Sequence, residues 1–199
     1  MTVKALPEAL KLWEHPAEMM ASWDSNEYKY TSEQTIAKMI GEVDSVADCG
    51  CGPGMFTYVL YCKEYYGFDQ SPQMVEMANR AYAPHFNAHF AIADIFKYCS
   101  SRHYNIALLI DVLQHQEDPL GALDRWLSLW DADRYIFTIL VGNEHEVLLN
   151  SVVVEEKVFD HILECSGLTI LSDVIIPVGN EKFHARLMEV SKEKMNDQG

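Results

Sequence analysis

The sequence predicts an α/β protein in which a doubly wound parallel sheet ends in an antiparallel hairpin. Between residues 43 and 166, apolar runs typical of buried strands alternate with amphipathic runs of helical spacing. This alternation is typical of a parallel sheet covered by helices on both faces. Near the end, only GNEK separates the apolar runs LTILSDVIIPV and FHARLMEV. So short a connection cannot carry a parallel crossover, and it therefore favours an antiparallel pair.

Local sequence signals predict where the individual strands and helices begin and end. Strands are expected at 43–49, 64–69, 88–93, 105–111 and 134–141, and helices at 55–62, from Ser71 onward, at 119–130 and at 155–166. Ser71 is a favourable N-cap and Pro72 fits the first helical turn. The segment 119–130 carries its leucines along one helical stripe, which predicts a helix packed on the sheet.

The first 42 residues are predicted to form a helical cap on this sheet. Its last helix is expected to begin at Thr31, which opens a capping box, and to stop at Gly41. Residues 43–191 then form the main domain, and residues 192–199 a loose tail. No internal repeat or low-complexity linker divides the chain, so one domain is expected.

Composition and charge limit the class of partner. The chain has 199 residues, of which 49% are hydrophobic, and no apolar run reaches the roughly 18 residues of a membrane span. The net charge of -15 opposes unaided binding to DNA or RNA, because that binding depends on Lys and Arg. Five scattered cysteines and a charged, proline-containing N-terminus favour a reducing compartment without export, so a cytoplasmic protein without a membrane partner is expected.

The run DCGCGPG at residues 48–54 is the strongest local signal. It follows the apolar stretch Val43–Ala47, and its three alternate glycines allow a ligand to approach the bare backbone. Asp69 ends the next strand, about twenty residues further on, where an acidic side chain accepts hydrogen bonds from a ribose. The pair indicates a ligand of the adenosine type. The glycine spacing departs from G-x-G-x-x-G, which disfavours NAD, and a Walker loop is absent from the sequence.

Four segments taken together resemble a known family. VADCGCGPG is similar to the first motif of class I S-adenosylmethionine-dependent methyltransferases, and YYGFDQSPQMVEMA is similar to their second. AIADIF and ALLIDVLQHQEDP resemble the later motifs of the branch that acts on small molecules. The resemblance covers roughly residues 28–190. It implies a seven-stranded sheet with an antiparallel last strand, S-adenosylmethionine as cofactor, and methyl transfer to a small-molecule acceptor.

The resemblance also implies a set of binding residues. It places the methionine part of the cofactor at Asp48, Gly50, Gly52 and Gly54, the ribose at Asp69, and the adenosine against Gln70. It places the adenine at Asp94 and Ile95 and the sulfonium side at Asp111 and Val112. Tyr28 or Tyr30 would close over the cofactor. Two of these have a structural alternative, since Asp94 could cap a turn and Asp111 could hold a loop by accepting backbone amides.

Catalytic residues are harder to predict, because displacement at an activated methyl group depends mostly on positioning. A general base is needed only for an acceptor that arrives protonated. His115 follows the fourth strand and is the leading candidate, although it could simply pack the next helix. Glu144 and His145, in the segment 142–154 that is expected to shape the acceptor pocket, are further candidates.

Three functions remain open at this level. The first is a small-molecule methyltransferase, favoured because the D/N-P-P-Y/F segment of amino-methylating enzymes is absent from the sequence. The second is a methyltransferase of RNA or protein that needs a partner, and the third is a non-catalytic cofactor-binding subunit. A homodimer or a partner subunit is compatible with each. No metal is expected, because Cys49 and Cys51 have no second ligand pair nearby in the sequence.

Overall fold

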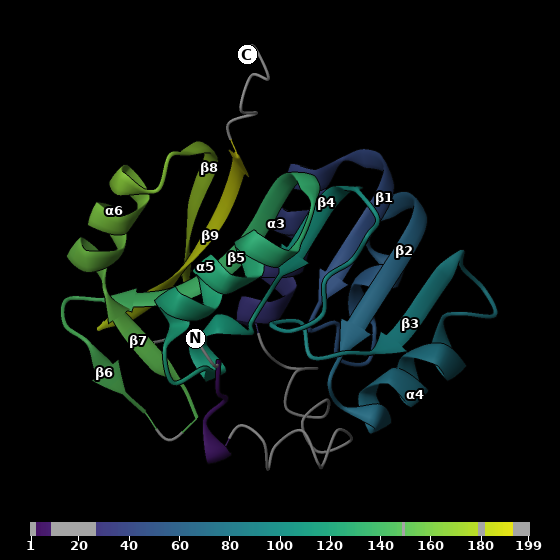
Figure 1. Cartoon of the computed structure of the whole chain (residues 1–199), viewed down its shortest axis with the longest axis horizontal. Coiled ribbons are helices and arrows are strands. Elements are labelled where there is room, and N and C mark those ends of the chain that lie inside the picture. Colours follow the sequence, from purple (N-terminus) through teal and green to yellow (C-terminus); the bar gives the residue numbers. More distant parts are fainter. Residues whose placement is uncertain (1–2, 9–26, 149, 179–181, 193–199) are drawn as a thin grey trace.

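The sheet is doubly wound and has an antiparallel end. The computed structural model describes residues 3–8, 27–148, 150–178 and 182–192. In chain order the main strands are β1 (Glu42–Cys49), β2 (Tyr61–Asp69), β3 (Ala88–Ile92), β4 (Tyr104–Leu109), β5 (Ala132–Gly142), β8 (Leu168–Pro177) and β9 (Phe183–Lys192). They are arranged as β3-β2-β1-β4-β5-β9-β8, and β9 runs antiparallel to both of its neighbours (Figure 1). The predicted fold class and the terminal hairpin are confirmed.

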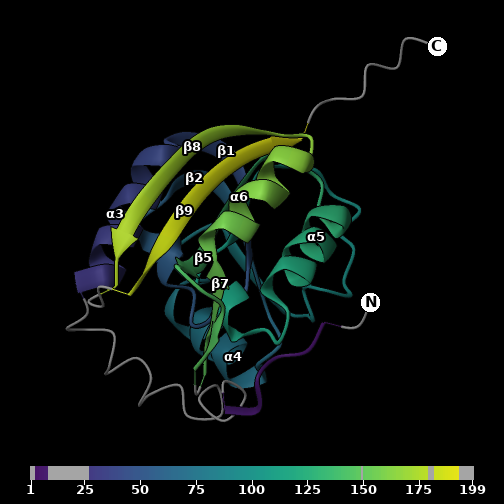
Figure 2. The same ribbon diagram turned by 90° about the vertical axis from the view of Figure 1, so that its left-hand side faces the viewer.

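Helices cover both faces of this sheet. In the described part of the chain they are α3 (Glu27–Ile40), α4 (Pro72–Ala81), α5 (Pro119–Leu129) and α6 (Glu156–Cys165). Figure 2 shows α3 on one face and α5 and α6 on the other. α3 buries Ile36 and Ile40 in one apolar cluster, and Trp126 of α5 and Phe159 of α6 are buried in the other. These two cores hold the carboxyl ends of β1, β2 and β4 side by side, which is where ligands bind in such sheets.

The helix before the sheet begins a turn earlier than the sequence predicts. The expected capping box at Thr31 is wrong, because α3 begins at Glu27 and Thr31 lies inside it. The additional turn carries Tyr28, whose hydroxyl donates a hydrogen bond to Asp111. A tertiary contact of this kind can override a local capping signal. The predicted end is confirmed, since α3 stops directly before Gly41, which has a φ of 66°.

Two further predictions need correction. The helix expected at 55–62 is only the short 3-10 helix η1 (Met55–Tyr58), because β2 already begins at Tyr61 and Gly54 offers no side-chain cap. The loop expected after the fifth strand contains the strands β6 (Glu146–Val147) and β7 (Val152–Glu155), which pair with each other, and β7 also pairs in parallel with the end of β5. Strands this short carry too little alternation to be recognised in a sequence.

The described part of the N-terminus lies against the loop that follows β4. Ala5 forms an antiparallel bridge with Gln116. The rest of the predicted helical cap, residues 9–26, falls outside the described residues, as does the tail from 193. Among the helices of the described segments, none is long and apolar enough to cross a membrane.

Candidate functional site

The glycine loop after β1 has backbone dihedral angles that residues with a side chain rarely adopt. Gly50, Gly52 and Gly54 have φ values of 85°, 53° and 83°, in the left-handed region that favours glycine. The Gly50 amide donates to the Phe68 carbonyl at 2.7 Å, which ties the loop to β2. A Cβ at Gly50 would lie 2.5 Å from Val112 Cγ2, whereas a Cβ at Gly52 would meet open space within 4 Å. The loop therefore presents bare backbone beside the end of β4.

Asp69 connects this loop to the next helix. Its Oδ2 accepts a hydrogen bond from the Gly52 amide at 2.9 Å, and its Oδ1 accepts one from the Ser71 amide at 2.8 Å. Ser71 in turn caps α4 through the Met74 amide. Burial raises the pKa of the Asp69 carboxyl, and the backbone amides oppose that rise. Each carboxylate oxygen has a second lone pair, so both can still accept a hydrogen bond from a ligand hydroxyl.

Asp48 lies at the end of β1, below the glycine loop. It is 2% exposed, and it accepts a hydrogen bond from the Tyr65 hydroxyl of β2. Burial, with the nearby Asp48 carboxylate as a second cause, raises the pKa of Tyr65 well above its ordinary value. The phenol therefore stays protonated and keeps donating to Asp48. The position expected at the methionine part of a cofactor is thus anchored from within the core.

Asp111 follows β4 in a strained backbone conformation. Its φ of 56° is the only positive value at a non-glycine residue among the described residues. Its amide donates to Thr138 Oγ1 at 2.7 Å, and its Oδ1 accepts from the Tyr28 hydroxyl at 2.7 Å. Burial, with Asp111 as a further cause, raises the pKa of Tyr28. Of the two tyrosines considered from the sequence, Tyr28 reaches Asp111, whereas Tyr30 is 68% exposed.

The residues expected at the adenine follow the neighbouring end of β3. Asp94 Oδ1 accepts from the Phe96 amide at 3.1 Å, and Oδ2 lies 2.6 Å from Lys97 Nζ, so Asp94 does cap a turn. Ile95 is 6% exposed, and its carbonyl accepts the Trp130 indole N–H at 3.0 Å. Gln70 is exposed beside Asp69. Their roles toward a ligand stay predictions.

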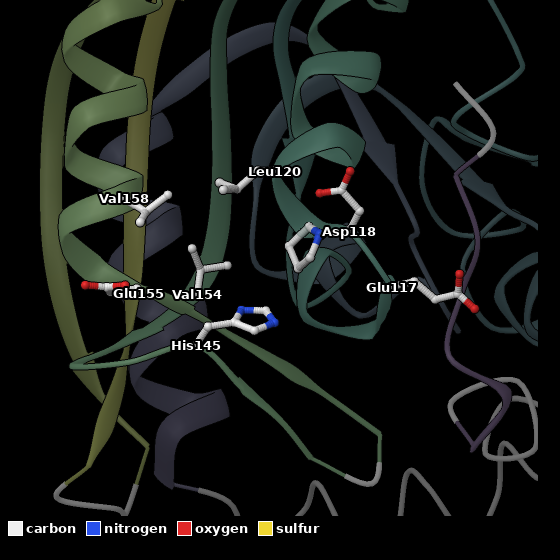
Figure 3. Close-up of a pocket in the computed structure, with 8 residues that line it drawn as sticks. Glu117, Asp118, Leu120, His145, Val154, Glu155 and Val158 are labelled. Carbon is white, nitrogen blue, oxygen red and sulfur yellow. The ribbon is translucent and has the colours of Figure 1, made fainter.

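The three candidate catalytic residues do not form one cluster in the described contacts. His115 ends the short helix η2 (Leu113–His115), and its Nδ1 lies 2.6 Å from the Asn150 carbonyl oxygen. Glu144 and His145 are exposed in the turn between β5 and β6. His145 borders a pocket between the first turn of α5 and the start of α6 (Figure 3).

That pocket encloses about 280 Å³. It is lined by Glu117, Asp118, Pro119, Leu120, His145, Val154, Glu155 and Val158. Figure 3 shows Leu120 and Val154 near its centre, while the Glu117 side chain points toward the N-terminal segment and away from His145. Sequence reasoning missed the lining from α5, because residues that start a helix give no signal of what faces them across a fold. The predicted pocket-shaping role of 142–154 remains a prediction.

The cysteines beside the glycine loop are buried rather than exposed to solution. Burial raises the pKa of Cys49 and of Cys51 well above the ordinary thiol value, with neighbouring carboxylates contributing. Within the described residues, His, Cys, Asp and Glu side chains form no group of three that could hold a metal ion.

A doubly wound sheet with an antiparallel hairpin, a glycine loop after β1 and an acidic residue ending β2 defines the class I methyltransferases. A family model described as a methyltransferase domain matches residues 41–184. The chain belongs to this methyltransferase family, and S-adenosylmethionine is accordingly its methyl donor. A search of the curated proteins gave no match.

Solved structures share the fold at low identity. The N-methyltransferase NodS from Bradyrhizobium japonicum, with S-adenosyl-L-homocysteine bound, is 17% identical at a TM-score of 0.68 over 86% of this chain and 90% of its own. Magnesium protoporphyrin IX methyltransferase from Synechocystis, with S-adenosylmethionine bound, is 18% identical at 0.65 over 96% and 100%. A chain from the complex of the Haloferax volcanii Trm112 activator with a methyltransferase is 14% identical at 0.65 over 96% and 99%. These likenesses show the fold alone.

Proposed function

We propose that this protein transfers the methyl group of S-adenosylmethionine to a small-molecule acceptor by in-line displacement. The observation that carries the proposal is the Asp69 carboxylate, which bonds the Gly52 amide of the glycine loop and the Ser71 amide of the next helix. This arrangement fixes a carboxylate beside exposed backbone, at the carboxyl end of two neighbouring parallel strands. It is the chemistry that a ribose with two adjacent hydroxyls requires.

The residues around Asp69 fit such a ligand. Open space above Gly52 leaves room for a ligand against the loop. We assign the methionine part to Asp48 and the glycines, the ribose to Asp69 and the adenine side to Gln70, Asp94 and Ile95. The Asp94 carboxylate would have to share its oxygens with Lys97, with which it is paired.

On the other side of the loop, Asp111 and Val112 would lie at the sulfonium. The donor supplies an already activated methyl group, so the protein has to align the acceptor and exclude water. Tyr28 and Thr138 hold Asp111 rigidly for that task. The acidic chain, with its net charge of -15, favours a neutral or cationic small acceptor over a nucleic acid. Magnesium protoporphyrin IX methyltransferase, by its name, acts on a small molecule, which supports the same class.

The test is calorimetric titration of S-adenosylmethionine and S-adenosylhomocysteine into the wild type and two variants. Asp69→Ala removes the carboxylate and should weaken both affinities at least tenfold, since hydrogen bonds to a charged group contribute about 1.5–3 kcal/mol each. Asp44→Ala is the matched control, because Asp44 lies on β1 far from the loop and its side chain is 71% exposed. Its affinities should equal those of the wild type.

Each outcome has a clear reading. Equal affinities for Asp69→Ala and wild type would refute the assigned ribose site. Binding without turnover of any small acceptor would favour the non-catalytic alternative. A wild-type chain that binds neither ligand would refute autonomous activity and favour a required partner subunit. The Haloferax volcanii complex, in which an activator accompanies a methyltransferase, is an example of such a partner.

A further inference from the structure

Two outer strands of the main sheet, β3 and β8, differ in length. β3 has five residues, whereas β8 has ten and pairs, within the described part of the chain, with β9 alone. Figure 2 shows this β8–β9 hairpin between α3 and α6. The outer edge of such a strand directs N–H and C=O groups away from its one neighbour. Only another extended backbone can pair with a row of these groups.

β8 also exposes large apolar side chains along this edge. Ile170, Leu171 and Ile175 are 47%, 48% and 61% exposed. Ile176, which belongs to the same apolar cluster as Ile36 of α3, is the only buried residue of the strand. The neighbouring strand β9, in contrast, has six buried residues in succession. Large aliphatic side chains gain free energy when they leave water, so the edge favours a partner that covers them.

The edge carries little unpaired charge, although the chain as a whole is strongly acidic. Asp173 is the only charged residue of β8, and Arg186 of β9 pairs with it through Nε at 3.2 Å and through Nη2. The same guanidinium pairs with Asp160 of α6. The net charge of -15 opposes contact between two copies over most surfaces. Two β8 strands bring only their paired Asp173 carboxylates to the contact, so this repulsion is small along the edge.

The stretch of β8 that can pair regularly is bounded on both sides. The register with β9 shifts between Ile170 and Ser172, which marks a bulge, and Pro177 has no N–H to donate. Residues 172–176 lie between these two interruptions. An antiparallel strand can pair with its own copy about a two-fold axis, so the same surface serves both partners. A second copy of this chain therefore supplies an extended backbone of matching length and low charge.

We propose that residues 172–176 of β8 pair with the same stretch of a second copy, so that two sheets join into one continuous sheet. In the strand order, β9, β5 and β4 separate this contact from β1 and its glycine loop. The dimer therefore leaves the proposed donor site open, and the inference does not depend on the proposed function.

Sedimentation equilibrium of the full chain tests the dimer. The wild type should approach the mass of two chains as its concentration rises, and salt should strengthen the association because it screens the net repulsion. Ile175→Glu should weaken it about tenfold or more, because each new carboxylate faces Asp173 or its own copy across the axis. Ile92→Glu is the matched control, since it adds the same charge at a 60% exposed side chain on β3, and it should leave the dissociation constant unchanged.

Two results of this experiment would overturn the proposal. One is a wild-type chain that stays monomeric at every concentration, and the other is a dimer that Ile175→Glu weakens no more than Ile92→Glu does. Circular dichroism should show the wild-type fold in both variants, which have their substitutions at exposed side chains. A wild type that dimerises without binding S-adenosylhomocysteine would contradict the proposed function and support this inference.

Hydrogen exchange read by mass spectrometry locates the contact. Amides of residues 172–176 that are not bonded to β9 should exchange fast in dilute protein and slowly where the chain is a dimer. Ile175→Glu should lose this protection at the same concentration. Protection of these amides in the monomer would mean that another segment of the same chain covers the edge, and protection gained only elsewhere would place the dimer contact on another surface. Either result would overturn the proposal.

Discussion

The loops after β1 and after β4 both adopt left-handed backbone, but they do so with different residues. Both follow parallel strands at the carboxyl edge of the sheet, and both contain left-handed backbone. The first uses glycines, for which this conformation costs little. The second uses Asp111, which is held by Thr138, 27 residues away, and by Tyr28, 83 residues away. Glycine in the first loop can be recognised in the sequence, whereas the strain in the second is visible only with its partners in place.

The two loops also meet. The position of a Cβ on Gly50 is occupied by the side chain of Val112, directly after Asp111. The bare backbone of the first loop is therefore needed for the second loop to pack against it, and in our proposal it also contacts the ligand. A change at this contact should affect both loops, while a change at Tyr28 should affect the second loop alone.

The largest expected effect is a difference in thiol reactivity, which tests whether the first loop is closed. Burial raises the pKa of the half-buried Cys62 to about 11, so its thiolate is roughly a hundredfold scarcer at neutral pH than for an unperturbed thiol. Burial also raises the pKa values of Cys49 and Cys51, whereas Cys99 and Cys165 are exposed. Iodoacetamide labelling at pH 7.5, mapped by mass spectrometry, should modify the exposed pair first. Rapid labelling of Cys51 would show an open loop.

Gly50→Ala should be the most destabilising substitution in the first loop. Left-handed backbone costs a residue with a Cβ about 1–2 kcal/mol, and the clash with Val112 adds about 1–3 kcal/mol of overpacking. Gly52→Ala is the control, since it has the strain without the clash. In urea unfolding, Gly50→Ala should be less stable than Gly52→Ala. Combining Gly50→Ala with Val112→Ala should restore part of that lost stability. Equal stabilities would contradict the contact between the loops.

Tyr28→Phe should loosen the second loop and leave the first one unchanged. The variant removes the hydrogen bond to Asp111, and a bond to a charged acceptor contributes about 1.5–3 kcal/mol. Tyr30→Phe is the matched control, because Tyr30 is 68% exposed. Thermal unfolding should give Tyr28→Phe a lower melting temperature than Tyr30→Phe. Calorimetry should still show that Tyr28→Phe binds S-adenosylhomocysteine, because the Asp69 side is unchanged. Indistinguishable melting curves would mean that Tyr28 does not stabilise Asp111.

The smallest effects on stability are expected at the N-caps of α4 and α5. Ser71 caps α4 beside the first loop, and Asp118 caps α5 beyond the second through the Gly121 amide. Ser71→Ala and Asp118→Ala should each cost about 1 kcal/mol in chemical unfolding. Glu117→Ala, which leaves the cap in place, should be close to neutral. A similar loss in Glu117→Ala would show that local charge rather than capping is responsible.

The geometry of the proposed donor half of the site could be anticipated from the sequence, because its signals are local. The strand, the glycine run, Asp69 and the Ser71 cap lie within residues 43–81, and the structure joins them by short-range hydrogen bonds. The strand order beyond them followed from the alternation of elements and the short GNEK connection. Prediction failed at the start of α3 because the deciding contact, from Tyr28 to Asp111, comes from a distant part of the chain, and it failed at the β6–β7 pair because these strands are very short.

The proposed acceptor half depends on contacts between distant parts of the chain. Asp111 could be placed at a strand end, but its strain and its bond to Tyr28 could not be foreseen. His115 could be singled out by its position, yet its link to Asn150 requires the β6–β7 turn. Pro119, which lines the pocket beside His145, closes the segment ALLIDVLQHQEDP, but that segment gave no sign that it faces His145.

The central claim is that the donor lies between the two loops, with its ribose on Asp69. A crystal structure of the chain with S-adenosylhomocysteine tests it most directly. We expect both ribose hydroxyls within hydrogen-bond distance of the Asp69 carboxylate, and the thioether sulfur beside the contact of Gly50 with Val112. A ribose bound away from Asp69, or a ligand that touches only one of the two loops, would contradict the account.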